Sequence, residues 1–524
     1  MSRDSQPDER HNERRYERRE GASWNDRRDR SQEDENRNRH GRQRSSSRMR
    51  GEKNYSSQAP SQRRRVSDSP RNVAFDVLCD VDVKDAYANL VLPSRLARAG
   101  LSGRDAGFAT ELAYGTLRMR GKYDAILAAC VDRPLSALDN SVVNALRLGC
   151  HQLLAMRVPP HAAVSQTVAL VRERVGAGPG QLVNAVLRKV SAKSADEWDE
   201  ELSADIEDDI ERLAVLESHP TWVVRALRGA LVAHGRESGE VSSLLTADNE
   251  AATVMLVARP PLSTPQEILD EVPGTLAAQY SPLGVASPSV APRNIGLIRN
   301  GLAGVQDEGS QLVALALANT PIDGDDERWL DMCAGPGGKS ALLAMLAAQR
   351  GARLVANEVS EHRTRLVQDN LQAVPAASVE AVRTGDGREI GADEPGAYDR
   401  VLVDAPCTGL GALRRRPEAR WRKEPRDVPA LAALQRELLA SALDAVRPGG
   451  VVAYVTCSPH HAETILPVDD VLAKRDDVQL IDAVPVVQDV AVNPIELGEG
   501  PRVQLWPHVH HTDAMHLALL RRLG

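Results

Sequence analysis

The stretch Trp329–Ser340, W-L-D-M-C-A-G-P-G-G-K-S, decides the fold of the chain. Two apolar residues open it, a glycine-rich turn occupies residues 335–338, and apolar residues at helical spacing follow over 341–346. This order predicts a strand, a tight turn and a helix. Glycine lets backbone N–H groups approach a ligand closely, and the start of a helix presents unpaired donors. The stretch therefore predicts a binding site for a nucleotide-like ligand.

Spacing narrows the choice of ligand. A phosphate-binding P-loop would require a glycine at the position of Cys333, and a dinucleotide fingerprint would require one at the position of Ser340. A second predicted strand leads to Glu358, about 20 residues past the turn, where a ribose-binding carboxylate is expected in such folds. The alternative is that Glu358 only ends a strand at the surface. A glycine turn with a ribose acid and no phosphate site indicates S-adenosylmethionine.

Length and composition bound the class of protein. The chain has 524 residues, 42% of them hydrophobic, which predicts two or three domains. No apolar run approaches the roughly 20 residues needed to cross a membrane, and the polar N-terminus does not resemble a signal peptide. We therefore expect a soluble cytoplasmic protein. The six cysteines show no CxxC spacing, which argues against a disulfide framework or a thiolate zinc site.

Charge is distributed unevenly along the chain. Residues 1–66 hold 19 Lys and Arg against 12 Asp and Glu, whereas the remainder is acidic and brings the net charge to −8. This basic segment has almost no aliphatic residues, so it cannot bury enough surface to offset the entropy of ordering. It is predicted to be a disordered Arg-rich tail. Such a tail either binds RNA phosphates or serves as a solubilising extension.

Three ordered parts are predicted after the tail. Residues 67–200 carry amphipathic helical patterns with almost no strand signal, which predicts an all-helical domain of five to seven helices. Residues 201–300 form a small mixed α/β connecting subdomain. Residues 301–524 alternate strands and helices, with strands expected near 328–332, 353–357, 378–383, 399–404, 450–456 and 477–482. This alternation predicts an α/β Rossmann-like domain with a mainly parallel sheet and helices on both faces.

Parallel strands bring their carboxyl ends to one edge of a sheet, where ligands bind. The predicted strand ends carry several acids and thiols: Asp331, Cys333, Glu358, Asp386, Asp404, Cys407 and Cys457. A free cysteine is more often an inert buried thiol. Cys407 nevertheless precedes a glycine-rich turn, and Cys457 has polar neighbours on both sides, so both are predicted to be accessible.

A metal site was considered because Cys457 and His460 lie close together and more histidines cluster over residues 508–516. Zinc ligands normally come in pairs at short spacing. No second pair accompanies Cys457 and His460, so no metal is predicted.

Two thiols near S-adenosylmethionine fit the methylation of cytosine at C5. This carbon is a poor nucleophile until a thiolate adds at C6, after which C5 accepts a methyl group. A base must then remove the C5 proton before the thiol leaves. The scheme requires a nucleophile, a base and a proton donor near N3, and two cysteines with one aspartate can supply these groups.

Several motifs carry a family resemblance. D-M-C-A-G-P-G-G-K, D-A-P-C-T-G-L-G and Y-V-T-C-S together resemble the RNA 5-methylcytosine methyltransferases of the RsmB/NOP family. The helical segments Y-A-N-L-V-L-P and R-D-A-G-F-A-T-E-L-A-Y-G-T-L-R are similar to the NusB-like RNA-binding domain of its RsmB/Sun/Fmu branch, which modifies small-subunit ribosomal RNA. The resemblance covers about residues 70–523. It implies an all-α NusB-like domain before an S-adenosylmethionine-dependent methyltransferase domain.

The resemblance also implies roles for individual residues. Cys457 would be the nucleophile at C6, Cys407 would assist release of the methylated product, and Asp404 would hold the cytosine edge near the cofactor. The additional T-C-S cysteine distinguishes the RNA enzymes from the DNA enzymes, which attack through a Pro-Cys cysteine. The implied S-adenosylmethionine contacts are Cys333, Ala334, Gly335, Pro336, Gly337, Gly338, Lys339, Glu358, Asp386 and Asp404.

Two departures from the family pattern concern substrate fit. The family often has an acidic pair around an asparagine after T-C-S, whereas this chain has His460-His461-Ala462-Glu463, in which only Glu463 keeps that character. The usual aromatic-rich ending appears here as T-D-A-M-H-L-A-L-L. A basic cluster after the Pro-Cys loop is predicted to grip RNA phosphates and stack a base, the alternative being a solvated helix start. It comprises Arg414, Arg415, Arg416, Arg420, Trp421 and Arg422.

The function expected from the sequence is methylation of cytosine C5 in small-subunit (16S) ribosomal RNA through a covalent adduct with cysteine. The enzyme is expected to act as a monomer without a metal. One alternative keeps the chemistry and changes the substrate to transfer RNA. Another is a non-catalytic RNA-binding factor for ribosome assembly, which the intact Cys407, Cys457 and glycine turn argue against.

Overall fold

The structure is a computed structural model that describes residues 68–287 and 291–524. The segment predicted to be a disordered tail lies outside the described residues. The described residues form one compact unit.

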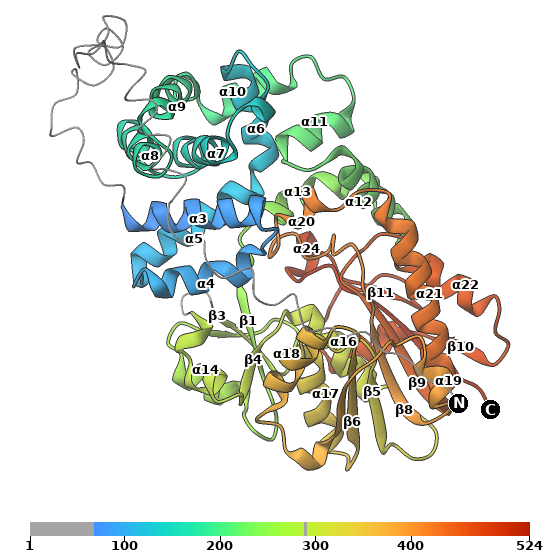
Figure 1. The fold of residues 1–524 in the computed structure, drawn as a ribbon. Helices are drawn as coiled ribbons and strands as arrows, with labels where there is room; N and C mark the ends of the chain where they lie inside the picture. The colour runs from blue at the N-terminus through green and yellow to red at the C-terminus, as the bar shows by residue number, and fades with distance from the viewer. Residues whose placement is uncertain (1–67, 288–290) are drawn as a thin grey trace, which may run out of the picture. The chain divides into compact units, whose positions relative to one another are not determined.

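The first part of this unit is entirely helical between residues 69 and 190, as predicted. Its hydrophobic core includes Phe75, Leu78, Leu112, Leu146 and Leu187. The central helix is buried over most of its length because its neighbours cover it on several sides (Figure 1). Its α-helices are α3 (Ser69–Val83), α4 (Ala88–Arg98), α5 (Gly103–Arg118), α6 (Arg120–Cys130), the central α7 (Asn140–Leu154), α8 (Pro160–Arg174) and α9 (Ala177–Val190).

A connecting part follows, with four helices and then a small antiparallel sheet in the order β2-β3-β1-β4. The helices are α10 (Ala195–Ser203), α11 (Asp209–Leu216), α12 (Thr221–Ala233) and α13 (Val241–Asn249). The sheet and its short helices are β1 (Val254–Ala258), α14 (Pro265–Glu271), β2 (Leu276–Ala277), β3 (Gly284–Ser287), α15 (Gly296–Arg299) and β4 (Ala303–Val305).

The last part contains a larger mixed sheet in the order β10-β12-β9-β8-β5-β6-β7, with β11 paired to β12. The five strands from β9 to β7 are parallel, and β12 runs antiparallel to both β9 and β10. The strands are β5 (Arg328–Asp331), β6 (Arg353–Glu358), β7 (Val379–Thr384), β8 (Tyr398–Asp404), β9 (Val446–Thr456), β10 (Val478–Ile481), β11 (Val503–Gln504) and β12 (His516–Arg522).

Helices cover both faces of this sheet, as predicted (Figure 1). Successive residues of β5 pack on opposite faces of the sheet: Trp329 belongs to the hydrophobic core on one face and Leu330 to the core on the other. The Trp329 face packs against α16 (Glu308–Asn319), α17 (Gly338–Ala348), α18 (Glu361–Leu371) and α23 (Ala483–Val490). The Leu330 face packs against α19 (Ile390–Asp393), α21 (Asp427–Ala445) and α22 (Ile465–Leu472). The short helices α20 (Ala419–Arg422) and α24 (Pro507–His510) lie in the connections.

In the part of the chain that the structure describes, no helix is long and apolar enough to cross a membrane.

Candidate active site

The glycine turn joins β5 to α17 and requires glycine at two positions. Gly337 has φ +108°, and a Cβ there would lie 2.9 Å from the Cα of Val367 in α18. A Cβ at Gly335 would overlap the carboxylate of Glu358. The Ser340 hydroxyl donates to Asp331 at 2.6 Å and so ties the start of α17 to the end of β5. Because Gly335 and Gly337 carry no side chain, the turn forms a cradle that is lined by backbone atoms at these two positions.

Glu358 ends β6 and lies at this turn. Its carboxylate accepts hydrogen bonds from the N–H groups of Gly335 at 2.9 Å and Ser360 at 3.0 Å. The Arg363 guanidinium lies 3.4 Å from the same carboxylate and also donates to the Gly335 carbonyl. The Glu358 side chain is only 3% exposed, so the alternative of a surface strand end does not describe it. Arg363 was not identified from the sequence, in which it lies among the polar residues of a surface helix.

Two other predicted cofactor contacts have different surroundings. Asp386 follows β7, and its carboxylate accepts from the backbone and the guanidinium of Arg388. These hydrogen bonds lower the pKa of Asp386. Cys333 is half-buried beside the turn, and burial together with the charges of Asp331 and Asp404 raises the pKa of its thiol. Cys333 is therefore a neutral side chain beside the glycine turn.

The two predicted catalytic cysteines meet at the ends of neighbouring strands. Cys407 follows β8 and Cys457 follows β9, and these two strands are parallel partners. Their Sγ atoms lie 3.4 Å apart, and both residues are half-buried. The loop geometry brings together thiols that are 50 residues apart in the sequence.

The surroundings of the two thiols shift their pKa values in opposite directions. The hydrogen bond from Cys407 lowers the pKa of Cys457 against the opposing effects of burial and Asp404, and the charges of Lys339 and Arg416 act in the same direction as that bond. The same bond, burial and the charge of Glu463 raise the pKa of Cys407. These opposite shifts make Cys457 the more acidic thiol of the pair and favour Cys407 as the S–H donor.

Lys339 links the glycine turn to this pair. Its ammonium donates to the Asp404 carboxylate at 2.8 Å. Burial opposes the charged form of Lys339, but the nearby Asp404 outweighs it and raises the pKa of the lysine. The predicted residues Asp404, Cys407 and Cys457 thus form one cluster with Lys339, which the sequence indicated only as a cofactor contact.

Glu463 connects the loop that carries Cys407 to the loop that carries Cys457. Its buried carboxylate accepts from the Thr408 N–H at 2.8 Å, from the Thr408 hydroxyl and from the Ser458 hydroxyl at 2.7 Å. Gln435 of α21 donates to the Pro406 carbonyl at 2.8 Å. Each of these bonds involves a residue next to Cys407 or Cys457. The sequence marked Glu463 as an acid retained from the family pattern but did not indicate this bridging role.

The basic cluster after the Pro-Cys loop requires a correction. Arg420 was predicted to contact RNA, but its side chain is fully buried. It donates to the carbonyls of Arg118, Ser218 and Asp248 and to the Asn249 side chain. The Arg420 guanidinium therefore forms hydrogen bonds within the protein, which link α20 to α5 and to the connecting part.

Most of the other members of the cluster also have partners within the protein. Arg414 is buried and donates to the His511 carbonyl at 2.9 Å, and Arg415 pairs with Asp307 and Asp513. Trp421 packs on Gly121 of α6. Arg422 donates to backbone carbonyls before α4. Arg416 is exposed.

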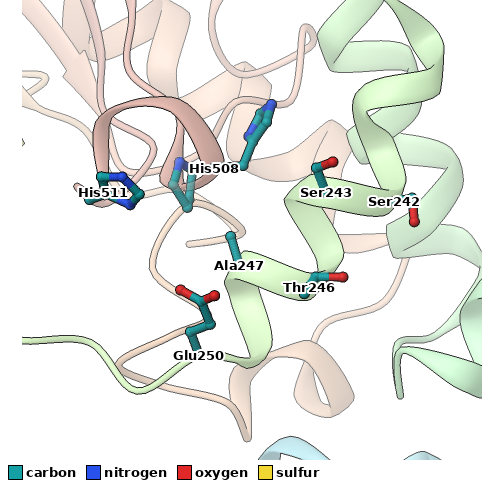
Figure 2. A pocket seen from close by; sticks show the side chains of 8 residues that line it. Ser242, Ser243, Thr246, Ala247, Glu250, His508 and His511 are labelled. Carbon is teal, nitrogen blue, oxygen red and sulfur yellow. The ribbon is translucent and has the colours of Figure 1, made fainter.

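A pocket of about 270 Å³ lies between α13 and α24 (Figure 2). Ser243, Thr246 and Glu250 line it from α13 and the residue that follows, and His508 and His511 face them. None of the predicted site residues lines it. His508 pairs with Glu240 at 2.9 Å. Among the described residues, no group of three or more His, Cys, Asp or Glu side chains is arranged to hold a metal ion.

The parallel sheet with a glycine turn after β5 and an acid after β6 defines a Rossmann-like methyltransferase fold. The chain belongs to the family described as 16S rRNA methyltransferase RsmB/F, whose model matches residues 317–521. The model of the NusB family matches residues 68–192. The expected family and its NusB-like domain are therefore confirmed.

Relatives match this chain over most of their lengths. A protein of Mycobacterium tuberculosis (strain H37Rv), described as a methyltransferase, is 51% identical over 88% of this chain and 98% of its own length. Ribosomal RNA small subunit methyltransferase B of Pseudomonas putida is 31% identical over 79% of this chain and 91% of its own length. The crystal structure of PH0851 matches 87% of this chain and all of its own, with a TM-score of 0.71 and 21% identity, which shows a shared fold.

Proposed function

We propose that the chain transfers a methyl group from S-adenosylmethionine to C5 of a cytosine in small-subunit ribosomal RNA, through a covalent adduct between Cys457 and C6. The observation that carries this proposal is the 3.4 Å contact between two thiols of unequal acidity at one sheet edge. The relatives named ribosomal RNA small subunit methyltransferase B support the choice of substrate.

The residues at the glycine turn fit S-adenosylmethionine. Backbone lines the cradle at Gly335 and Gly337, where a Cβ would overlap neighbouring atoms, and the Glu358 carboxylate is fixed beside it. Residues 333–339 together with Glu358, Asp386 and Asp404 would hold the cofactor. When bound, it supplies an electrophilic methyl group.

Cys457 supplies the nucleophile. Its thiolate forms a bond to C6, and the C5–C6 π electrons move to C5, which then bonds to the methyl carbon. The bond from that carbon to the sulfonium sulfur breaks, and its electron pair leaves with S-adenosylhomocysteine. A base removes the C5 proton, the freed electron pair restores the double bond, and the bond from sulfur to C6 breaks. Cys407 lies within hydrogen-bond distance of the departing sulfur and holds a proton, so it assists this last step.

Asp404 and Lys339 orient the target cytosine. Their ion pair borders the thiol pair, and its two members offer an acceptor and donors to the edge of a cytosine. The target base must leave its stack because Cys457 has to approach C6 from the ring face. The half-buried cluster suits a single flipped base.

Cysteine variants test this proposal. Wild-type protein, Cys457→Ala, Cys407→Ala and the control Cys79→Ala in α3 are each incubated with small-subunit ribosomal RNA and S-adenosylmethionine. We expect methyl transfer by wild type and the control, none by Cys457→Ala, and an RNA–protein adduct that persists on a denaturing gel for Cys407→Ala. Methylation by Cys457→Ala at the wild-type rate would exclude the nucleophile assignment. Preferred methylation of transfer RNA transcripts would show that the substrate is transfer RNA and not ribosomal RNA.

A further inference from the structure

The end of α3, the start of α4 and the loop between them are hydrogen-bonded to the segment that follows Cys407. Arg422 donates to the Ala86 carbonyl at 2.6 Å and to the Val81 carbonyl at 3.2 Å. Glu418 accepts from the Ala88 N–H at 2.9 Å. These bonds join backbone of the helical part to side chains of the methyltransferase part, and they fix the loop beside the catalytic loops.

Tyr87 lies in this loop and remains 40% exposed. The Arg422 guanidinium lies 4.7 Å from the centre of its ring and that of Arg416 lies 5.6 Å away. Val83 and Leu90, on the flanking helices, are 71% and 69% exposed. The Tyr87 ring thus lies near two guanidinium groups while part of it faces solvent, and the exposed Val83 and Leu90 add uncovered apolar side chains to the adjoining helices.

Arg416 differs from the other arginines of its cluster. It is exposed, and across residues 68–287 and 291–524 no carboxylate oxygen lies within 4.0 Å of its nitrogen atoms. Its charge nevertheless reaches the reactive thiol: after the hydrogen bond from Cys407 and the charge of Lys339, it is the next influence that lowers the pKa of Cys457. Arg416 thus lies near the Tyr87 ring and its charge also acts on the Cys457 thiol.

We propose that Tyr87, Arg416 and Arg422, which we call the Tyr87 edge, bind the RNA nucleotide next to the target cytosine. Its base stacks on the Tyr87 ring and its phosphate pairs with Arg416. Arg422, whose Nη2 donates to backbone carbonyls and whose Nε pairs with Asp85, holds the ring in place. The proposal rests on the proposed function in taking RNA as the substrate.

The chemistry of the edge favours single-stranded RNA over other partners. Unstacked bases are recognised by stacking on aromatic rings and guanidinium planes, with arginine on the phosphates. An acidic peptide would use Arg416 but would have no need of an exposed ring. The edge also gives the helical part a direct contact with substrate, since Tyr87 belongs to that part of the chain.

Binding measurements on the full chain test the edge. A short fluorescein-labelled single-stranded RNA with one cytosine is titrated at several salt concentrations. We expect Tyr87→Leu to weaken binding roughly tenfold and Tyr87→Trp to preserve it, because stacking needs an aromatic ring. Arg416→Gln should reduce the slope of log affinity against log salt by about one phosphate contact. The control Arg225→Gln, at an exposed arginine of α12, should behave as wild type.

Two outcomes would overturn the proposal. One is wild-type affinity of Tyr87→Leu at an unchanged unfolding temperature. The other is displacement by a poly-glutamate peptide that depends on Arg416 while Tyr87→Leu has no effect on RNA, which would indicate a protein-binding surface.

Photo-crosslinking separates this proposal from the proposed function. RNA that carries 5-iodouridine beside the cytosine is irradiated with the protein, and the crosslinked peptide is identified by mass spectrometry. A crosslink at Tyr87 supports the edge even if no 5-methylcytosine forms. Methylated cytosine without any crosslink at Tyr87, from wild-type protein, supports the proposed function and excludes the edge.

Discussion

Cys457 and Cys407 differ in their surroundings although their sulfur atoms lie 3.4 Å apart. Lys339 and Arg416 act on the first thiol and Glu463 on the second. The meeting of the two thiols could be predicted, because parallel strands end at one edge of a sheet. Their unequal acidity could not, because it depends on side chains that only the folded loops bring into range.

The hydrogen bond from Cys407 predicts a pH effect on Cys457. Removing the donor in Cys407→Ala takes away the largest influence that lowers the pKa of Cys457, so that pKa should rise. The pH profile of Cys457 alkylation by iodoacetamide, followed by peptide mass spectrometry, should therefore shift to higher pH. Cys79→Ala serves as the control, and an unchanged or lower midpoint in Cys407→Ala would contradict the assigned donor.

The bridge made by Glu463 predicts a loss of rate. Glu463→Gln replaces one acceptor oxygen by an N–H donor, so the hydroxyls of Thr408 and Ser458 lose their shared partner. A misplacement of about 1 Å in the cysteine loops lowers the rate by on the order of a hundredfold. Single-turnover methyl transfer measures this loss, with the exposed Glu211→Gln as control. A wild-type rate at unchanged stability would show that the bridge does not position the thiols.

Among the elements, all six predicted strands overlap strands of the structure. The buried parallel strands β8 and β9 were the easiest to predict, because such strands are continuous apolar runs. The insertion of β12 between β9 and β10 was not predicted. The run H-L-A-L-L-R-R from His516 to Arg522 indicates a strand but carries no signal for its neighbours.

The glycine turn predicts a position-dependent effect of alanine. At Gly337 a left-handed backbone costs a residue with a Cβ about 1–2 kcal/mol, and the Cβ would also press on Val367. Gly337→Ala should lower the unfolding temperature and weaken S-adenosylmethionine binding in calorimetry. Gly229→Ala in α12 is the control, since a Cβ there meets nothing within 4 Å and the residue lies outside the glycine turn. Equal behaviour of the two variants would contradict the described turn.

At the scale of the whole molecule, one buried arginine joins the helical, connecting and methyltransferase parts. Arg420 donates to Arg118, Ser218, Asp248 and Asn249. The sequence R-R-R-P-E-A-R-W-R looks the same whether it is solvated or buried. Its burial could not be predicted because the accepting groups lie some 170 to 300 residues away.

Loss of Arg420 should loosen this junction. Arg420→Met leaves buried carbonyl groups without donors, each of which costs about 1–3 kcal/mol. We expect a lower thermal unfolding midpoint and faster proteolysis between residues 190 and 220. Arg426→Met, at a side chain that is 80% exposed, is the control. Identical stability of Arg420→Met and wild type would show that the junction does not depend on this residue.

The central claim is that Cys457 enables methyl transfer to cytosine C5 in small-subunit ribosomal RNA. The most direct test incubates that RNA with labelled S-adenosylmethionine and wild-type protein or Cys457→Ala, then digests it and separates the nucleosides by mass spectrometry. We predict labelled 5-methylcytidine with wild type and none with Cys457→Ala. Label on another nucleoside or another atom of cytidine, or equal 5-methylcytidine from both proteins, would contradict the claim.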